Sequence, residues 1–113
     1  MVKIEAFIQP FKLDEVKTAL KPLGIGAIVI SEVFESGGPA PLKGVYRGHE
    51  YVVDTPRVKL EMLISSLQVD EVVETLSLAA RTNGPGDDGI ILIQEVADAI
   101  RIRSGARVGS VIF

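Results

Sequence analysis

Cysteine and tryptophan are absent from this 113-residue sequence, and histidine occurs only once. Without cysteine, neither disulfides nor thiolate metal sites can form, and His49 alone offers a transition metal too few ligands. No apolar run approaches the roughly 20 residues that span a bilayer, and the first five residues do not resemble a signal peptide. These absences predict a cytoplasmic protein without a metal site.

An excess of positive charge is also absent, because 12 Lys and Arg residues face 15 Asp and Glu residues, for a formal net charge of −3. A nucleic-acid-binding protein normally needs a basic surface that displaces counterions from phosphates, so we do not expect that function. Any anion site must be local. With 47% hydrophobic residues, the chain is expected to fold as a single domain, residues 1–113, around its own core.

Apolar residues follow two different periods along the chain. Alternation over 2–8 and 58–64, and β-branched residues over 25–34 and 90–96, predict four strands. Apolar residues at i, i+3, i+4 and i+7 predict helices over 13–23 and 69–80. The order β-α-β-β-α-β is the ferredoxin-like plan of the α+β class, in which two helices cover one face of a four-stranded antiparallel sheet.

The sheet face that the helices leave open is expected to carry apolar residues of its own, which are Phe7, Ile28, Ile30, Phe34 and Leu63. In a chain of this size these side chains need a partner, most simply another copy of the chain. The apolar tail, residues 104–113, is expected to dock on a subunit too. The sequence therefore predicts a homo-oligomer.

Residues 36–54 are rich in glycine and proline and show no usable period, which predicts a loop of about 18 residues. Connections in compact domains rarely reach this length unless they bind something. Tyr46 and Tyr51 are suited to contact a partner protein. An insertion without a function is the alternative.

A glycine-rich segment, residues 82–89 (TNGPGDDG), precedes the last predicted strand, and Arg101 and Arg103 follow that strand. The glycines leave backbone N–H groups uncovered, so the segment can hold an anion. The two arginines, spaced i, i+2 in an expected extended segment, would lie on the same side. Together they indicate a phosphate site; a plain turn and a solvated arginine pair are the alternatives.

Five segments, in order along the chain, carry a resemblance to one family. They are 8–16 (IQPFKLDEV), 46–54 (YRGHEYVVD), 58–61 (VKLE), the glycine segment 82–90 and 100–105 (IRIRSG). On these segments the sequence resembles the PII signal-transduction protein family over nearly its whole length. The resemblance implies a homotrimer with an adenine nucleotide (ATP, ADP or AMP) in each intersubunit cleft and a long T-loop that engages target proteins.

The resemblance also assigns roles by position, with the T-loop at about 37–54, the phosphate loop at about 82–90 and the C-terminal segment at 97–113. Arg101 and Arg103 match the phosphate-binding arginines of the family, whose guanidinium forks suit phosphate oxygens. The other implied nucleotide-binding residues are Gly86, Asp87 and Gly89 in the phosphate loop, and Val29, Glu61 and Leu63 around the base and ribose. Mg²⁺ would accompany ATP.

Candidate effector or partner contacts in the T-loop are Gly37, Gly38, Lys43, Tyr46 and Arg47. By the same resemblance, Tyr51 matches a tyrosine that some family members carry as a nucleotidylation site. His49 stands where a small residue is usual, so this modification motif is imperfect.

Two departures from the family lie near the implied phosphate and effector sites. Ile90 replaces the usual lysine after the phosphate loop, and Asp88 adds a negative charge there. A γ-phosphate should therefore be held less well, so that ADP or AMP competes with ATP. The family's T-loop glutamine, which helps to bind Mg-ATP and 2-oxoglutarate, has no counterpart in residues 37–40. The second effector is thus open between 2-oxoglutarate and another small molecule such as bicarbonate.

The favoured function is a nonenzymatic sensor whose nucleotide occupancy orders or frees the T-loop, which then binds or releases a membrane transporter or an enzyme. One alternative is a small phosphate-ester or acyl-phosphate hydrolase on the same fold, for which His49 is the only imidazole. Another is a purely structural trimer related to metal-tolerance proteins, which the lack of cysteine does not support.

Overall fold

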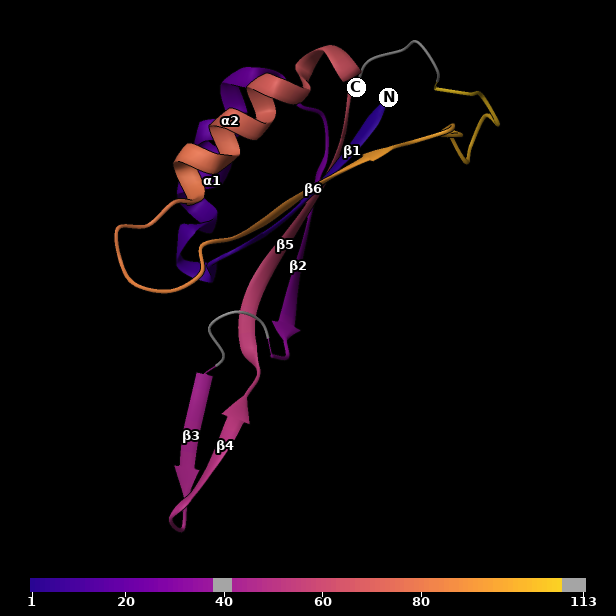
Figure 1. Ribbon diagram of the computed structural model, residues 1–113. Helices are drawn as coiled ribbons and strands as arrows, with labels where there is room; N and C mark the ends of the chain where they lie inside the picture. Colours follow the sequence, from indigo (N-terminus) through magenta and orange to yellow (C-terminus); the bar gives the residue numbers. More distant parts are fainter. Residues whose placement is uncertain (38–41, 109–113) are drawn as a thin grey trace.

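The structure is a computed structural model that describes residues 1–37 and 42–108 (Figure 1). Its helices and strands, in order, are β1 (Val2–Ile8), α1 (Leu13–Leu20), β2 (Ile28–Glu35), β3 (Leu42–Tyr46), β4 (His49–Val53), β5 (Thr55–Ile64), α2 (Val69–Ala80) and β6 (Gly89–Glu95). Short 3-10 turns lie at Pro10–Lys12, Lys21–Leu23 and Ser66–Gln68. Within the described residues, no helix is long and apolar enough to cross a membrane.

Four strands form one antiparallel sheet in the order β2-β5-β1-β6, and both helices lie on the same side of it (Figure 1). This arrangement confirms the predicted ferredoxin-like fold. The acidic residues Asp14 and Glu15 lie in the first turn of α1, and Asp70 and Glu71 in that of α2, where the helix dipole favours negative charge. Gly24 ends the turn after α1 in the left-handed region, with φ of 68°.

The core lies between the sheet and the helices. Burial alternates along β1, whose even-numbered residues are all buried, and the same pattern runs through most of β5. Val16 and Leu20 of α1, and Val72 and Leu76 of α2, are fully buried against them. Each such side chain stabilises the fold by about 1.5–3 kcal/mol relative to exposure. The two sequence periods therefore meet in a single core.

The prediction of an irregular loop over residues 36–54 is wrong for its larger part. β3 and β4 form an antiparallel hairpin that extends away from the main sheet, so the molecule measures 59 Å along its longest axis (Figure 1). Arg47 and Gly48 make the two-residue turn with φ of 52° and 80°, values that suit a tight hairpin turn. Apolar and polar residues do not alternate along these two short strands, so a period-two pattern could not predict them.

The prediction that Ile28, Ile30 and Phe34 lie on the open face of the sheet is wrong. Residues directly opposite each other in an antiparallel pair share a face, and Ile28 and Ile30 lie opposite the buried Met62 and Leu60. Phe34 has the same parity, so all three are on the helix side. Phe7 and Leu63 do lie on the open face, as expected. The register of β2 depends on its partner strand, which local alternation could not reveal.

The C-terminal arginines lie in a turn and not in an extended segment. Arg101 N donates to Ala106 O at 2.9 Å, Gly105 N donates to Arg101 O at 2.8 Å, and Gly105 has φ of 69°. The expected alternation about Ile102 is therefore wrong, because a glycine-stabilised turn reverses the chain here. Val108 is buried, and its N–H donates to Ala99 O. The predicted docking of the tail falls mainly on residues 109–113, outside the described residues.

Candidate functional site

Four alternating charges occupy the middle of the open sheet face. Glu61 Oε1 lies 2.9 Å from Lys59 Nζ and 3.4 Å from Lys3 Nζ, and Lys3 Nζ lies 2.9 Å from Glu5 Oε1. The hydrogen bond from Lys59, helped by Lys3, lowers the pKa of Glu61. The hydrogen bonds to Glu5 and then Glu61 raise the pKa of Lys3. Glu61 is thus held as a carboxylate at neutral pH.

A pocket of about 430 Å³ opens beside this cluster and brings three of the predicted site residues together. Val29, Glu61 and Leu63 all line it; Lys3, Ala27, Met62 and Val96 complete its wall. Val29 and Leu63 give the pocket an apolar surface, and the Glu61 carboxylate can accept hydrogen bonds from amino or hydroxyl groups. This combination suits a flat heterocycle or a sugar.

The predicted phosphate loop, residues 82–90, is called the glycine loop below. It lies at the other end of the sheet, where β6 begins. Gln9 Nε2 donates to Asp87 O at 3.0 Å, and Gly89 N donates to Asp87 Oδ1 at 3.2 Å. Gly89 has φ of 113°, and a Cβ there would lie 1.8 Å from Phe7 O. Only glycine allows the loop to approach β1 this closely. Gly86, with φ of 109°, also adopts a conformation that favours glycine.

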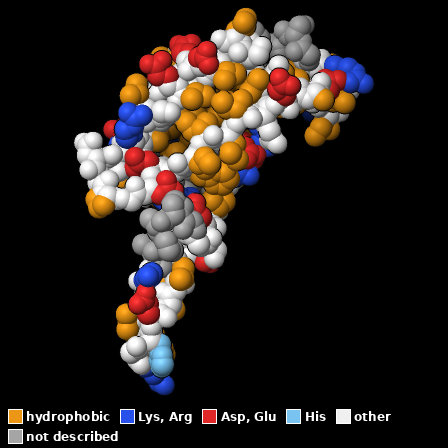
Figure 2. All heavy atoms as spheres, in the orientation of Figure 1, with side chains coloured by type: hydrophobic (Ala, Val, Ile, Leu, Met, Phe, Trp, Pro, Cys, Tyr) orange, Lys and Arg blue, Asp and Glu red, His pale blue; other side chains and the backbone are white. Residues whose placement is uncertain are grey.

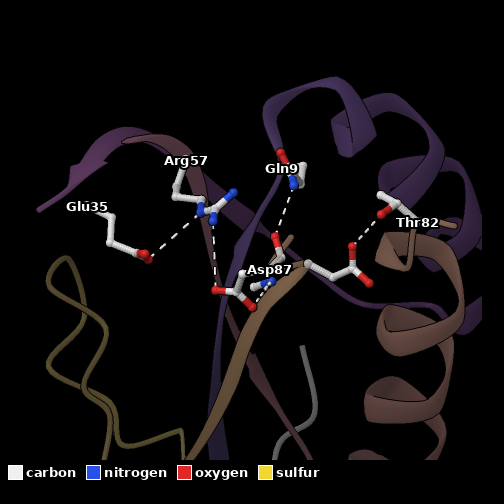
Figure 3. A network of polar contacts seen from close by, with 7 residues as sticks. Gln9, Glu35, Arg57, Thr82 and Asp87 are labelled. Atoms are coloured by element: carbon white, nitrogen blue, oxygen red, sulfur yellow. Dashed lines mark hydrogen bonds and ion pairs between the residues drawn. The ribbon is translucent and has the colours of Figure 1, made fainter. Parts of the chain in front are cut away.

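Arg57, which lies in none of the predicted sites, connects this loop to the base of the hairpin. Its Nη2 lies 3.8 Å from Asp87 Oδ2, and its Nε lies 3.8 Å from Glu35 Oε2 (Figure 3). The side chain is only 5% exposed. On β5, Arg57, Lys59 and Glu61 occupy every second position and lie on the open face. The predicted strand began at residue 58; a strand predicted from Thr55 would have placed Arg57 on this face as well.

The additional acidic residue of the loop, Asp88, has a different partner. Thr82 Oγ1 donates to Asp88 Oδ1 at 2.6 Å, so the carboxylate closes the loop onto the segment that follows α2 (Figure 3). This hydrogen bond is the main reason that the pKa of Asp88 lies below its ordinary value. Asp88 is therefore ionised at neutral pH and turned toward Thr82.

The arginine turn and the glycine loop do not meet within one chain. Gly89 begins β6 and Glu95 ends it, and seven strand residues span on the order of 20 Å. Arg101 and Arg103 lie beyond the far end of this strand (Figure 1). The three parts of the predicted site, which are the pocket, the glycine loop and the arginine turn, are thus distributed over the sheet.

Comparison with known proteins shows which family shares this arrangement of segments. The family model described as "Nitrogen regulatory protein P-II" matches residues 1–106. The chain belongs to the P-II family. Nitrogen regulatory protein P-II of Rhodospirillum rubrum is 45% identical over 113 residues, covering 99% of this chain and 100% of that protein. Those of Rhodobacter capsulatus and Haemophilus influenzae are 47% and 44% identical over 106 residues, covering 93% of this chain and 94% of each relative.

Membership of the P-II family confirms the resemblance seen in the sequence, and it makes the protein a signalling regulator. His49, the single histidine of the sequence, is exposed in β4, and Figure 2 shows it at the far end of the hairpin. Within one chain it is remote from the glycine loop, so His49 does not lie beside the phosphate site as a base.

The hairpin of this P-II family member presents most of the predicted partner contacts. Tyr46 and Arg47 lie at its tip, with the guanidinium 5.3 Å from the ring centroid of Tyr46. Lys43 Nζ lies 3.1 Å from Glu50 Oε1, so it is engaged across the hairpin. Gly37 has φ of 81°, and Gly38 lies outside the described residues.

Tyr51, the predicted modification site, is also on the hairpin. It stands opposite Gly44, and a Cβ on Gly44 would lie 2.5 Å from the Tyr51 ring. The ring therefore lies over the glycine backbone and is half-exposed. Glycine at position 44 is what leaves room for it.

Proposed function

We propose that this P-II family member is an adenine-nucleotide sensor that works as a homotrimer. An ATP, ADP or AMP molecule binds between neighbouring copies, with its base and ribose against Val29, Glu61 and Leu63. Its phosphates bind the backbone N–H groups of the glycine loop at Gly86, Asp87 and Gly89, and Arg101 and Arg103 complete the phosphate site. Mg²⁺ accompanies ATP.

The observation that carries this proposal is the separation of the glycine loop from the arginine turn along β6. One nucleotide cannot bridge that strand within a single chain, but a second copy can bring its own segment to the first. The apolar open face supports such an assembly, since Val29 is 53% and Leu92 is 42% exposed.

The T-loop, residues 37–54, is the output of the sensor. Nucleotides that differ in affinity for two T-loop arrangements shift its population, and the exposed Tyr46 and Arg47 then bind or release a membrane transporter or a metabolic enzyme. A second effector, 2-oxoglutarate or bicarbonate, binds at the base of the T-loop near Gly37. Nucleotidylation of Tyr51 would change the same surface.

Calorimetric titration with ATP, ADP and AMP, combined with the mass in solution by light scattering, tests this proposal. We expect a trimer that binds one nucleotide per chain, with ADP or AMP competing effectively with Mg-ATP because Ile90 supplies no cation. GDP is the matched control, since it carries the same phosphates on a different base. A monomer, or a trimer that binds none of the three adenylates, would refute the proposal.

Repeating the ATP titration with 2-oxoglutarate and then with bicarbonate tests the second effector. We expect one of the two anions to tighten Mg-ATP binding. An effector that binds the ATP-loaded protein better than the empty one must raise the affinity for ATP by the same factor. If neither anion changes the affinity, the effector is of another class.

A further inference from the structure

The carboxylate of Asp87 already makes the contacts that a ligand anion would make in the glycine loop. Its Oδ1 accepts a hydrogen bond from the Gly89 N–H at 3.2 Å, and its Oδ2 lies 3.8 Å from Arg57 Nη2 (Figure 3). Backbone N–H groups and guanidinium groups are the donors with which proteins bind phosphate oxygens. One carboxylate thus bridges the two groups that a phosphate would bridge.

The backbone beneath Asp87 is held in place independently of its side chain. Gln9 donates to the Asp87 carbonyl, and Gly89 is packed against the carbonyl of Phe7. The Asp87 side chain is 29% exposed. Rotation about its Cα–Cβ bond can therefore carry the carboxylate into solvent while the loop keeps its shape.

The buried cation on the other side of this contact needs a negative partner. Arg57 is 5% exposed, and within the described residues its Nε has no hydrogen-bond partner. Its second carboxylate, Glu35, lies 3.8 Å away. A buried guanidinium that loses one of two carboxylates is destabilised unless another anion replaces it. A phosphate oxygen entering the loop would do so.

We propose that Asp87 is an internal competitor for the nucleotide's phosphate. The carboxylate occupies the glycine loop of the unliganded protein, and the phosphate must displace it to reach Gly89 N–H and Arg57. The inference rests on the proposed function, because the displacing anion is the phosphate of the adenylate. Arg57 also contacts Glu35, the last residue of β2, so the exchange is transmitted to the strand that leads into the T-loop.

Titration of the Asp87→Asn variant with ADP tests the competition. If the open arrangement makes up about a tenth of the unliganded protein, removing the carboxylate's charge raises ADP affinity on the order of tenfold. Adenosine, which has no phosphate, should gain nothing. Asp87→Ala, which also vacates the space, should gain at least as much as Asp87→Asn. Thermal unfolding of each variant shows that it is folded.

Asp88→Asn is the matched control. It removes the same charge from the neighbouring residue, whose carboxylate faces Thr82 and not the Gly89 N–H. It should raise ADP affinity by only about twofold, as expected for a screened charge. Equal gains in the two Asn variants, or no gain in Asp87→Asn, would overturn the inference and leave the nucleotide sensor intact. If neither the natural protein nor any Asp87 variant binds ADP, both proposals fall; binding by the variants alone would support the competition.

Discussion

Arg57 shows how one residue can connect two segments that are distant in the sequence. Its guanidinium lies between Glu35 and Asp87, and both ion pairs are 3.8 Å long. It is buried, whereas Arg101 and Arg103 are exposed. The two arginines that the family resemblance identified thus differ in exposure from Arg57, which is buried between two strands of the fold.

At Arg101, the shape of the cationic group should matter for ADP affinity as well as its charge. Arg101→Lys should lower ADP affinity about tenfold, because an ammonium keeps the charge but loses the bidentate fork. Calorimetric titration measures the change. Arg107→Lys is the control: it makes the same substitution in the same turn, in a side chain paired with Asp98. Equal losses in both variants would mean that the turn, and not a phosphate contact, is affected.

Glu61 leads to a prediction about pH. Its pKa lies below the ordinary value of 4.5 chiefly through Lys59, so its ionisation stabilises the fold above that value, and this contribution is lost as the pH falls through the lowered pKa. Lys59→Met should raise the pKa of Glu61, as measured by NMR titration of the carboxyl carbon. Lys12→Met, which removes a lysine paired with Glu15, should leave it unchanged. An unaltered pKa in Lys59→Met would contradict the assignment.

At the scale of elements, the start of β6 depends on a close approach between two backbones. Gly89→Ala should destabilise the protein by about 2 kcal/mol or more, because it combines a positive φ with a clash against Phe7 O. Chemical denaturation gives the free energy of unfolding. Gly84→Ala, where a Cβ meets nothing within 4 Å, should change it by less than about 0.5 kcal/mol. Similar stabilities for the two variants would show that the loop can relax.

The hairpin shows where elements escaped the sequence patterns. β3 and β4 are only five residues each, and β4 is exposed along its whole length. Because β4 has no buried face, its apolar and polar residues need not alternate, so a period-two search does not find it. The helix α2 is the opposite case, because its buried stripe imposed the period that predicted Val69–Ala80 correctly.

For the whole molecule, the open sheet face predicts how copies assemble. Leu92 lies opposite Glu5 on that face and is 42% exposed. Leu92→Arg should convert the expected trimer into monomers and abolish ADP binding, because removing a guanidinium from water at an apolar interface is costly even beside Glu5. Light scattering and titration measure the two effects. Leu78→Arg, on the exposed side of α2, should alter neither. A Leu92→Arg trimer would place the interface elsewhere.

Local patterns along the chain were enough to establish the family, the order of the sheet and helix elements, and the helix boundaries to within a few residues. Periodicity and motifs depend on residues that are near one another in the sequence, so they could predict these local features. They could not reveal the side of β2 that faces the helices, the turn around Arg101, or the burial of Arg57 between Glu35 and Asp87. Those features depend on strand register and on contacts between distant segments, which exist only once the sheet has formed.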